Sequence, residues 1–447
     1  MKTLRFLTIA SGLLLLAGCS QSDEMECLSK QDASKPGGHR MPTRSLEDAI
    51  GIAAEWFRMQ SPTRSDADNT VGNVELLTGL RPGESVPDTL LYLINYAGDR
   101  GFAIVGAPMT ADNIYAYAEK GRVSLSDTVD NTGLTSFLNT TITEMYTETG
   151  GVIIGPGIIP PPEIPTTVTK LIRGVDPMLP EKVAEWNQYY PYNQYAPVIN
   201  GVQGVTGCVP LAIGQLLAYY RYPFSISGKM LKWSDMVEGK DNNMVSFLLE
   251  TIASSQYLNA TYEHLKDSNN NSLPELNPIL RGSPEKNITP TFKKLGFLTE
   301  LSFTNSYFRD SAIRNKIFDF MEGENNEIGY RKAPVLGWAL GYQNPSDTET
   351  PATMVGLHCY VIDGFKVFGE YSTIIDGNPL ISTTTFLHNI WGFPNSKANG
   401  YYKYFPEHDR LSDESSQFYN LGFTYYNLRI YGKYAAPQSS LAPPTAR

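Results

Sequence analysis

Apolar residues follow two different spacings along the chain, and together they outline a first folded region. From Ser45, which can cap a helix in an approximate capping box with Asp48, apolar positions fall at helical spacing as far as Phe57. Three strand-like runs separated by Gly and Asp turn residues follow, and a second amphipathic segment closes the region. The strands are expected at Leu90–Tyr96, Gly101–Val105 and Ile114–Tyr117, and the closing helix at Leu134–Thr147. The pattern predicts a small α+β domain over residues 45–148.

Glycine and proline interrupt this pattern between residues 149 and 166, where a run of three prolines follows Pro156-Gly157. Such a stretch cannot sustain a helix or a central strand, so we expect an extended linker that proteases can reach. Residues 167–435 are long enough for one substantial domain. Residues 436–447, rich in Pro, Ser and Ala, are expected to form a frayed tail.

The N-terminus has the pattern of an export signal. Two basic residues precede an apolar run over residues 6–17, which is too short for a comfortable membrane span. The segment Leu16-Ala17-Gly18-Cys19 resembles the lipobox of bacterial lipoproteins, in which Cys19 would be lipidated and become the mature N-terminus. The alternative is an ordinary signal peptide with an incidental cysteine. We expect residues 1–18 to be removed and residues 19–44 to form a flexible tether. The protein is then expected in the bacterial cell envelope, anchored by lipid to the outer membrane on its periplasmic or external face, or secreted.

The composition is typical of a folded protein and argues against nucleic-acid binding. Of the 447 residues, 41% are hydrophobic and 18% are charged, a mixture that can bury a large core. The formal net charge is −10 and no Lys/Arg-rich stripe overrides it, so nucleic-acid phosphates are repelled. If Cys19 carries lipid, three cysteines remain, Cys27, Cys208 and Cys359. An odd number in an exported chain indicates a reactive thiol, although a disulfide from Cys27 is also compatible with the sequence.

Cys208 combines a thiol with the start of a helix. The residues after it are strongly apolar as far as Tyr222-Pro223, and Pro210 fits a first helical turn. At a helix N-terminus the macrodipole and the free backbone N–H groups favour a thiolate, and the same N–H groups can hold an oxyanion. A buried structural cysteine would show the same local pattern.

A nucleophilic cysteine needs an imidazole within hydrogen-bond reach. Two of the five histidines, His358 and His388, lie outside the tether and the polar, loop-like stretches; the other three are His39, His264 and His408. His358 begins an apolar run that ends at an expected turn, Asp363-Gly364, so we predict it on a strand with Cys359 on the opposite face. About 150 residues separate it from Cys208, a spacing found in papain-like enzymes.

Two clusters offer amide side chains for such a site. After His388 come Asn389 and Trp391, in a Gly/Asn-rich hairpin region. An amide oxygen can accept the second N–H of the imidazole, and an indole can shield that bond from water. Upstream of the cysteine, Gln188 in Trp186-Asn187-Gln188 is a candidate oxyanion donor. Neither cluster identifies the chemistry alone, but the order Gln, Gly-Cys, His, Asn/Trp indicates a cysteine peptidase.

In that order the motifs resemble the streptopain family, secreted bacterial cysteine peptidases with a papain-like fold. The matching segments are Trp186-Asn187-Gln188 with Pro191-Tyr192-Asn193; Thr206 to Val209 with Ala212, Gln215, Tyr219 and Tyr222-Pro223; His358 with Val361 to Gly364; and His388 to Gly392 with Asn399-Gly400-Tyr401. They span about residues 166–435. Residues 45–148 resemble the propeptide-type domain that precedes such enzymes.

The resemblance implies an α+β fold: a small α+β prodomain followed by a papain-like domain with a helical lobe and an antiparallel β lobe. It implies Cys208 as nucleophile, His358 as base, Gln188 as oxyanion donor and Trp391 as the shield of the imidazole contact. The prodomain would keep a zymogen latent until the linker or the nearby Lys170–Arg173 stretch is cut. We expect an endopeptidase that acts on proteins or peptides as a monomer. No cofactor is implied, and no His or Cys pair has zinc-site spacing.

Two departures from the family pattern concern the hairpin. Aligned on Trp391-Gly392, the asparagine position of the family holds Ile390, and Asn389 lies one residue earlier. Phe393-Pro394 also replaces the usual Trp-Gly. Either the register shifts so that Asn389 still orients His358, or that group is lost. The alternative hypothesis is therefore a catalytically weak or inactive surface protein that uses a peptidase cleft to bind peptides.

Overall fold

The computed structural model describes residues 42–61, 65, 69–79, 88–129, 131–148, 167–264, 279–299, 311–322, 332–343, 353–373, 379–404, 425–431 and 434–435. The predicted export signal, most of the tether, the linker and the tail lie outside these residues. So do Cys19, Cys27, His39 and His408. Within the described ranges, no helix has the length and apolar character needed to cross a membrane.

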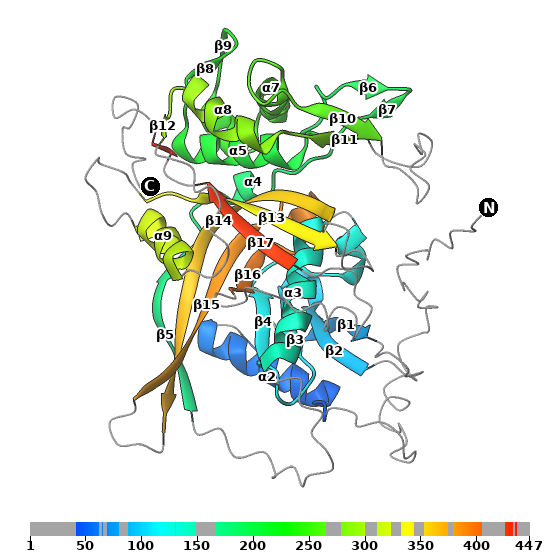
Figure 1. Cartoon of the computed structure of the whole chain (residues 1–447), viewed down its shortest axis with the longest axis vertical. Helices are drawn as coiled ribbons and strands as arrows, with labels where there is room; N and C mark the ends of the chain where they lie inside the picture. Colours follow the sequence, from blue (N-terminus) through cyan, green and yellow to red (C-terminus); the bar gives the residue numbers. More distant parts are fainter. Residues whose placement is uncertain are drawn as a thin grey trace, which may run out of the picture.

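Ten strands of the described part form one antiparallel sheet, in the order β1-β2-β3-β4-β16-β15-β14-β13-β17, with β5 also paired to β14 (Figure 1). The N-terminal strands are β1 (Val71–Gly79), β2 (Asp88–Tyr96), β3 (Phe102–Gly106), β4 (Ile114–Ala118) and β5 (Thr167–Val175). The C-terminal strands are β13 (Val335–Gln343), β14 (Thr353–Ser372), β15 (Leu380–Ile390), β16 (Gly400–Lys403) and β17 (Tyr425–Tyr431). The predicted prodomain and the predicted peptidase domain thus share a sheet, joined where β4 pairs with β16.

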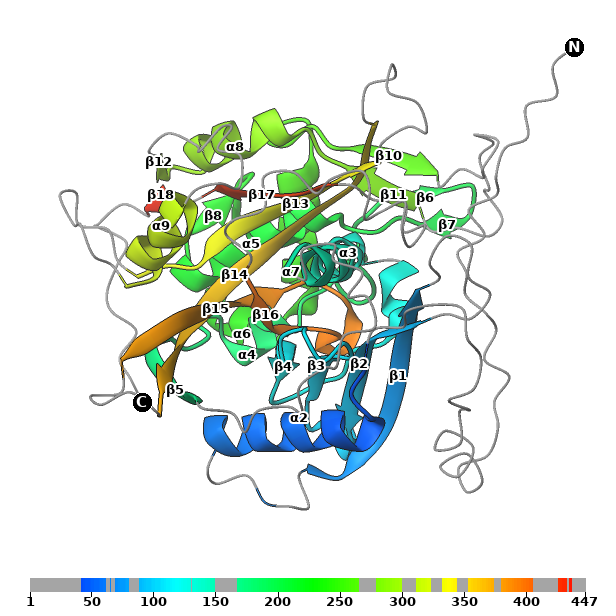
Figure 2. The ribbon, with the colours of Figure 1, turned by 60° about the horizontal axis from the view of Figure 1, so that its bottom comes forward.

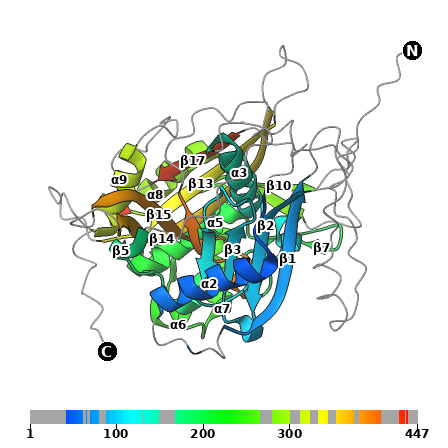
Figure 3. The ribbon, with the colours of Figure 1, turned by 90° about the horizontal axis from the view of Figure 1, so that it is seen from below.

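The helix predicted from Ser45 is α2 (Leu46–Gln60), and the capping box with Asp48 is confirmed. Trp56 on α2 packs against Phe368 and Phe386 of the C-terminal strands, with ring centroids 4.9 and 5.5 Å away. Figure 3 shows α2 lying across β2 and β3. The second predicted helix is α3 (Thr132–Glu148), which packs in a different core cluster, against β13 and β14 (Figure 2). The three predicted strands are confirmed, and β1 is an additional one.

The helical lobe packs on the face of the sheet opposite α3, at the top of Figure 1. Its helices are α4 (Glu181–Ala184), α5 (Cys208–Tyr220), α6 (Trp233–Val237), α7 (Asn242–Ala253) and α8 (Ile288–Lys294). Residues 209–218 of α5 are all buried, because α5 packs between β14 and α7. A helix surrounded on all sides needs apolar residues all round, which explains its sequence.

Shorter elements complete the described part. The two-residue strands are β6 (Val198–Ile199), β7 (Val202–Gln203), β8 (Ser225–Ile226), β9 (Lys229–Met230), β12 (Leu298–Thr299) and β18 (Tyr434–Ala435), which pair as β6–β7, β8–β9 and β12–β18. The hairpin β10 (Thr261–His264) and β11 (Ile279–Gly282) lies beside the turn that precedes α5, and α9 is Ser311–Glu322. Four 3₁₀ turns occur at Ala97–Asp99, Leu125–Val129, Glu285–Asn287 and Pro394–Ser396.

The α+β class is confirmed, with two local corrections. Asp363-Gly364 is not a turn, because β14 continues to Ser372 with a shift of register against β15 at this point. A Cβ at position 364 would lie 2.8 Å from the carbonyl oxygen of Val175, so this glycine permits the close approach of β5. His264, expected in a loop, ends β10.

Candidate active site

Cys208 is the first residue of α5, as the sequence predicts. Gly207 precedes it with φ = 87°, a left-handed conformation that glycine adopts without strain. The Cys208 thiol is hydrogen-bonded to backbone groups that include those of Cys359 and Val209. Burial raises the pKa of this thiol, and the backbone hydrogen bonds oppose the rise without cancelling it.

His358 lies on β14, one residue before the backbone group that contacts the Cys208 thiol, and it is 3% exposed. Its Nε2 is 2.8 Å from the carbonyl oxygen of Trp391. A carbonyl can only accept, so Nε2 carries the proton and Nδ1 of the neutral ring is left as an acceptor. Burial lowers the pKa of His358 to about 4, although the bond to Trp391 raises it. Tyr360 and Phe393 also lie near the ring, with centroids 6.2 and 5.5 Å away.

Asn399 fixes the backbone of Trp391. Its Oδ1 accepts the N–H of Trp391 at 2.9 Å, and its Nδ2 donates to the carbonyl oxygen of Ala184 at 3.3 Å. Asn399 thus connects the residue that binds His358 to the helical lobe. The sequence predicts no role for Asn399, although it opens the matching Asn399-Gly400-Tyr401 segment, and that position is the available signal.

Asn389 lies on β15 opposite Ile362 and Gly400, and no hydrogen bond joins it to His358. Its Oδ1 is buried without a hydrogen-bond partner among the described residues. His388, the second candidate base, bonds Asp363 at 2.6 Å through Nδ1 instead. The backbone carbonyl of Trp391 therefore accepts the imidazole N–H for which the sequence predicts the side-chain amide of Asn389 as the acceptor.

Gln188 is half-buried, and its backbone connects it to the nucleophile segment. The carbonyl oxygen of Gln188 accepts the N–H of Thr206 at 3.0 Å, two residues before Cys208. Trp186, in the same motif, is fully buried in the core around α5. The structure thus brings the Gln, Cys and His motifs together, with Trp391 1% exposed beside the imidazole.

The predicted prodomain covers this site through the start of α3. A Cβ added at Gly133 would lie 2.5 Å from Cζ3 of Trp391 and 2.9 Å from Cδ2 of His358, so the backbone of α3 touches both rings. This contact helps to bury the imidazole. The lowered His358 pKa and the raised Cys208 pKa both favour the uncharged form of each group, and no hydrogen bond joins these two described side chains. Across the described ranges, no group of three or more His, Cys, Asp or Glu could hold a metal ion.

Comparisons with known proteins agree with the motifs. The Peptidase C10 family model matches residues 186–402, and the Spi protease inhibitor model matches residues 42–145. The thiol protease/hemagglutinin PrtT of Porphyromonas gingivalis is 28% identical over 158 residues, which are 33% of this chain and 17% of that protein. The chain thus matches less than a fifth of the length of this relative.

Two solved structures from Prevotella intermedia are also similar. The match to a prointerpain A fragment has a TM-score of 0.44 at 17% identity. It covers 82% of this chain and 99% of that fragment. The match to active interpain A has a TM-score of 0.35 at 17% identity. It covers 59% of this chain and 96% of the interpain A chain. Since the two family models match successive parts of one polypeptide, the chain combines a Spi-type inhibitor domain with a domain of the peptidase C10 family, the streptopain family of cysteine peptidases.

Proposed function

We propose that the protein is a cysteine endopeptidase made as a latent zymogen, with Cys208 as nucleophile and His358 as base. The observation that carries this proposal is the pairing of a helix-start thiol with a strand imidazole. The Cys208 thiol contacts the backbone of Cys359, and the preceding His358 is bound through Nε2, which leaves Nδ1 to accept the thiol proton. The thiolate would attack a peptide carbonyl, form an acyl-enzyme and release it by hydrolysis, with the protonated imidazole acting as acid on the leaving amine.

The supporting groups are assigned from their contacts. The oxyanion would be held by the backbone N–H of Cys208 and the side chain of Gln188, whose segment is bonded to Thr206. The carbonyl of Trp391, rather than the amide of Asn389, would orient the imidazole. The indole of Trp391 would shield that bond from water.

Latency follows from the prodomain contact. While α3 covers the imidazole, a substrate cannot reach it, and the low pKa of His358 opposes the thiolate–imidazolium pair. Of the two predicted processing regions, Lys170–Arg173 lies inside β5 and pairs with β14, and Arg173 bonds Glu322 through Nε at 2.6 Å. A protease requires an unpaired extended segment, so we place the cut before β5, in the linker.

The location of the protein is inferred from its first residues alone. The basic, apolar and Leu-Ala-Gly-Cys pattern supports export and a lipid anchor at Cys19, in the cell envelope. The match to the peptidase C10 family supports protein or peptide substrates, and we expect the protein to act as a monomer. Metabolic labelling with a radioactive fatty acid tests the anchor: the label should be present in the wild type and absent in Cys19→Ser.

The function is tested by incubating the purified precursor beside its Cys208→Ala variant and reading the masses over time. We expect processing before β5 in the wild type only, and labelling of Cys208 by a thiol-directed epoxide once processing has occurred. A wild-type precursor that is neither processed nor labelled, even after the linker is cut by another protease, would favour the peptide-binding hypothesis instead.

A further inference from the structure

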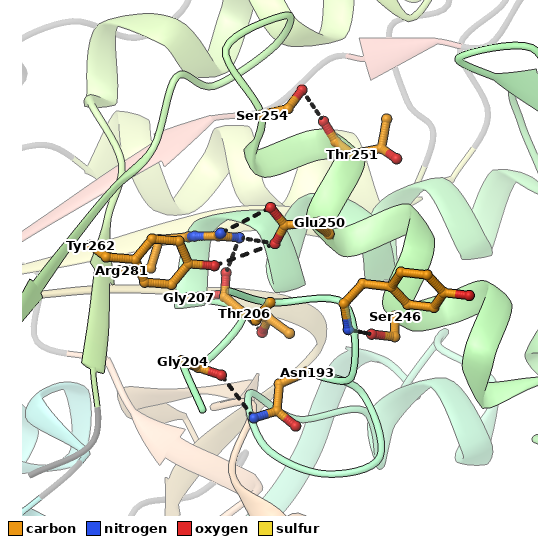
Figure 4. Close-up of polar contacts among 12 residues, drawn as sticks. Asn193, Gly204, Thr206, Gly207, Ser246, Glu250, Thr251, Ser254, Tyr262 and Arg281 are labelled. Atoms are coloured by element: carbon orange, nitrogen blue, oxygen red, sulfur yellow. Dashed lines mark hydrogen bonds and ion pairs between the residues drawn. The ribbon is translucent and has the colours of Figure 1, made fainter. Parts of the chain in front are cut away.

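A buried guanidinium lies directly behind the turn that carries the nucleophile. Arg281, on β11, is paired across the hairpin with Tyr262 of β10, and its side chain is 2% exposed. Figure 4 shows it beside the Tyr262 ring and close to Thr206 and Gly207, with its guanidinium directed at Glu250 of α7. Arg281 has no part in the catalytic roles proposed for Cys208, His358, Gln188 and Trp391.

The contacts of Arg281 with the turn involve both its stem and its fork. A Cβ built at Gly207 would lie 3.2 Å from Cβ and Cγ of Arg281 and 3.3 Å from its Cδ, so the aliphatic stem packs on the residue before Cys208. The Nη1 group donates to the carbonyl oxygen of Thr206 at 3.5 Å. The side chain therefore limits the movement of two consecutive peptides before the nucleophile.

Arg281 is itself held from two sides. Nη1 and Nη2 reach the two carboxylate oxygens of Glu250 at 2.7 and 3.1 Å, a two-pronged pair. The guanidinium carbon lies 3.9 Å from the ring centre of Tyr262, and the hydroxyl of Tyr262 donates to Glu250 at 3.3 Å. A planar fork fixed in this way has one available orientation, which is what a positioning group requires.

Thr206 connects this cluster to the other side of the site. Its carbonyl accepts from Arg281, and its N–H donates to Gln188 at 3.0 Å. The two proposed oxyanion donors, the Gln188 side chain and the Cys208 N–H, thus lie on chain segments that meet at Thr206.

We propose that Arg281, held by Glu250 and Tyr262, is a positioning residue that fixes the Thr206–Gly207–Cys208 turn and with it the oxyanion donors of the peptidase. This inference rests on the proposed function. Displacement of catalytic groups by about 1 Å lowers turnover by about 100-fold, and loss of one oxyanion donor costs a similar factor. The effect should be confined to steps that build negative charge on the substrate oxygen.

The test separates this role from a purely structural one. In Arg281→Met/Glu250→Leu, both charges are removed together, so no unpaired charge stays buried and the fold can be kept. The matched control is Lys240→Met/Glu238→Leu, the same change at an exposed pair with an Nζ–Oε2 distance of 2.6 Å. Each full-length precursor would be processed with immobilised wild-type enzyme, which is then removed, and its melting temperature would be measured.

Three readouts follow on the processed proteins: kcat and KM for a peptide substrate, the affinity for a peptide aldehyde, and the inactivation rate with methyl methanethiosulfonate. The aldehyde forms a tetrahedral adduct that needs the oxyanion donors, whereas the thiosulfonate transfers a methylthio group to the thiolate, releases a sulfinate and has no carbonyl. We expect kcat and aldehyde affinity of the double variant to fall by about 10- to 100-fold. KM, the thiosulfonate rate, its pH profile and the melting temperature should stay near those of the control.

Other results overturn the inference in distinguishable ways. An unchanged kcat in a folded double variant removes the role of Arg281 and leaves the proposed function standing. An equal fall in kcat and in the thiosulfonate rate shows that the cluster supports the thiol or the fold and does not act through the oxyanion donors. A wild type without Cys208-dependent hydrolysis overturns the proposed function, and the inference falls with it.

Discussion

At the scale of single residues, the imidazole of His358 depends on a backbone atom whose own position depends on one side chain. The carbonyl of Trp391 accepts from Nε2 of His358, and the neighbouring N–H of Trp391 is held by Asn399. Ile390 takes no part, since it is 2% exposed and packs toward the helical lobe with Cys359. The isoleucine at the asparagine position of the family is therefore compatible with an oriented base.

This arrangement makes opposite predictions for two asparagines. Asn389→Leu should leave kcat within about twofold, because Oδ1 of Asn389 bonds to no other group among the described residues. Asn399→Ala should lower kcat by about 10-fold or more, because the Trp391 carbonyl is then free to turn away. Steady-state hydrolysis by the processed enzymes measures both, and Asn399→Asp, which keeps an acceptor, is the control. A large loss in Asn389→Leu would restore the orienting role to that residue.

The sequence predicts the side-chain members of this site better than its backbone members. Cys208 and His358 are identified by helix-start and strand patterns that are local in sequence, and the structure places both on the expected elements. The Trp391 carbonyl could not be predicted, since every residue has one and its direction depends on a hydrogen bond eight residues away. Arg281 had no signal either, because its partners Glu250 and Thr206 are separated from it by 31 and 75 residues.

At the scale of elements, α3 covers the site because its first turn has no side chain at the point of contact. Gly133 lets the backbone approach Trp391 and His358 closely, while Leu134 and Phe137 bury themselves in the shared core. The amphipathic pattern predicts this helix nearly to its ends. The surface against which it packs is formed by strands more than 200 residues later, and periodicity contains no information about that.

Gly133→Leu should therefore weaken latency. The new side chain would overlap the Trp391 ring, so α3 must shift away, and self-processing of the precursor should accelerate by about 10-fold or more. Gly51→Ala, on α2 with no atom within 4 Å of the added Cβ, is the control and should process at the wild-type rate. Mass spectrometry over a time course gives both rates. Unaltered processing in Gly133→Leu would show that this contact does not maintain latency.

At the scale of the whole molecule, covering the imidazole links latency to pH. In the precursor the pKa of His358 is about 4, against an ordinary 6.5, because it is buried. The covered form thus binds fewer protons than an opened form. The contribution of His358 to closure is complete above pH 6.5 and is lost as the pH falls toward 4, by about 3 kcal/mol in total.

The prediction concerns the affinity of the prodomain in a Cys208→Ala precursor nicked in the linker. Between pH 6.5 and 4 this affinity should fall by up to about 10-fold per pH unit, because one proton is taken up on opening. Calorimetry or fluorescence at several pH values provides the constants. The same measurement on Cys208→Ala/His358→Gln should lose most of this dependence, and an identical slope in both variants would assign it to other groups.

The shared sheet has a further consequence for the enzyme once the inhibitor domain has left. In the precursor, β16 is an interior strand, with β15 on one side and β4 on the other through Tyr401 and Tyr402. Departure of β4 converts it into a border strand with open backbone donors and acceptors, which other extended chains can join. The new border is only four residues long and ends at Lys403, whose ion pair with Asp112 is broken at the same moment. Maturation thus leaves an edge that is short and charged, the form in which sheet borders best resist self-association.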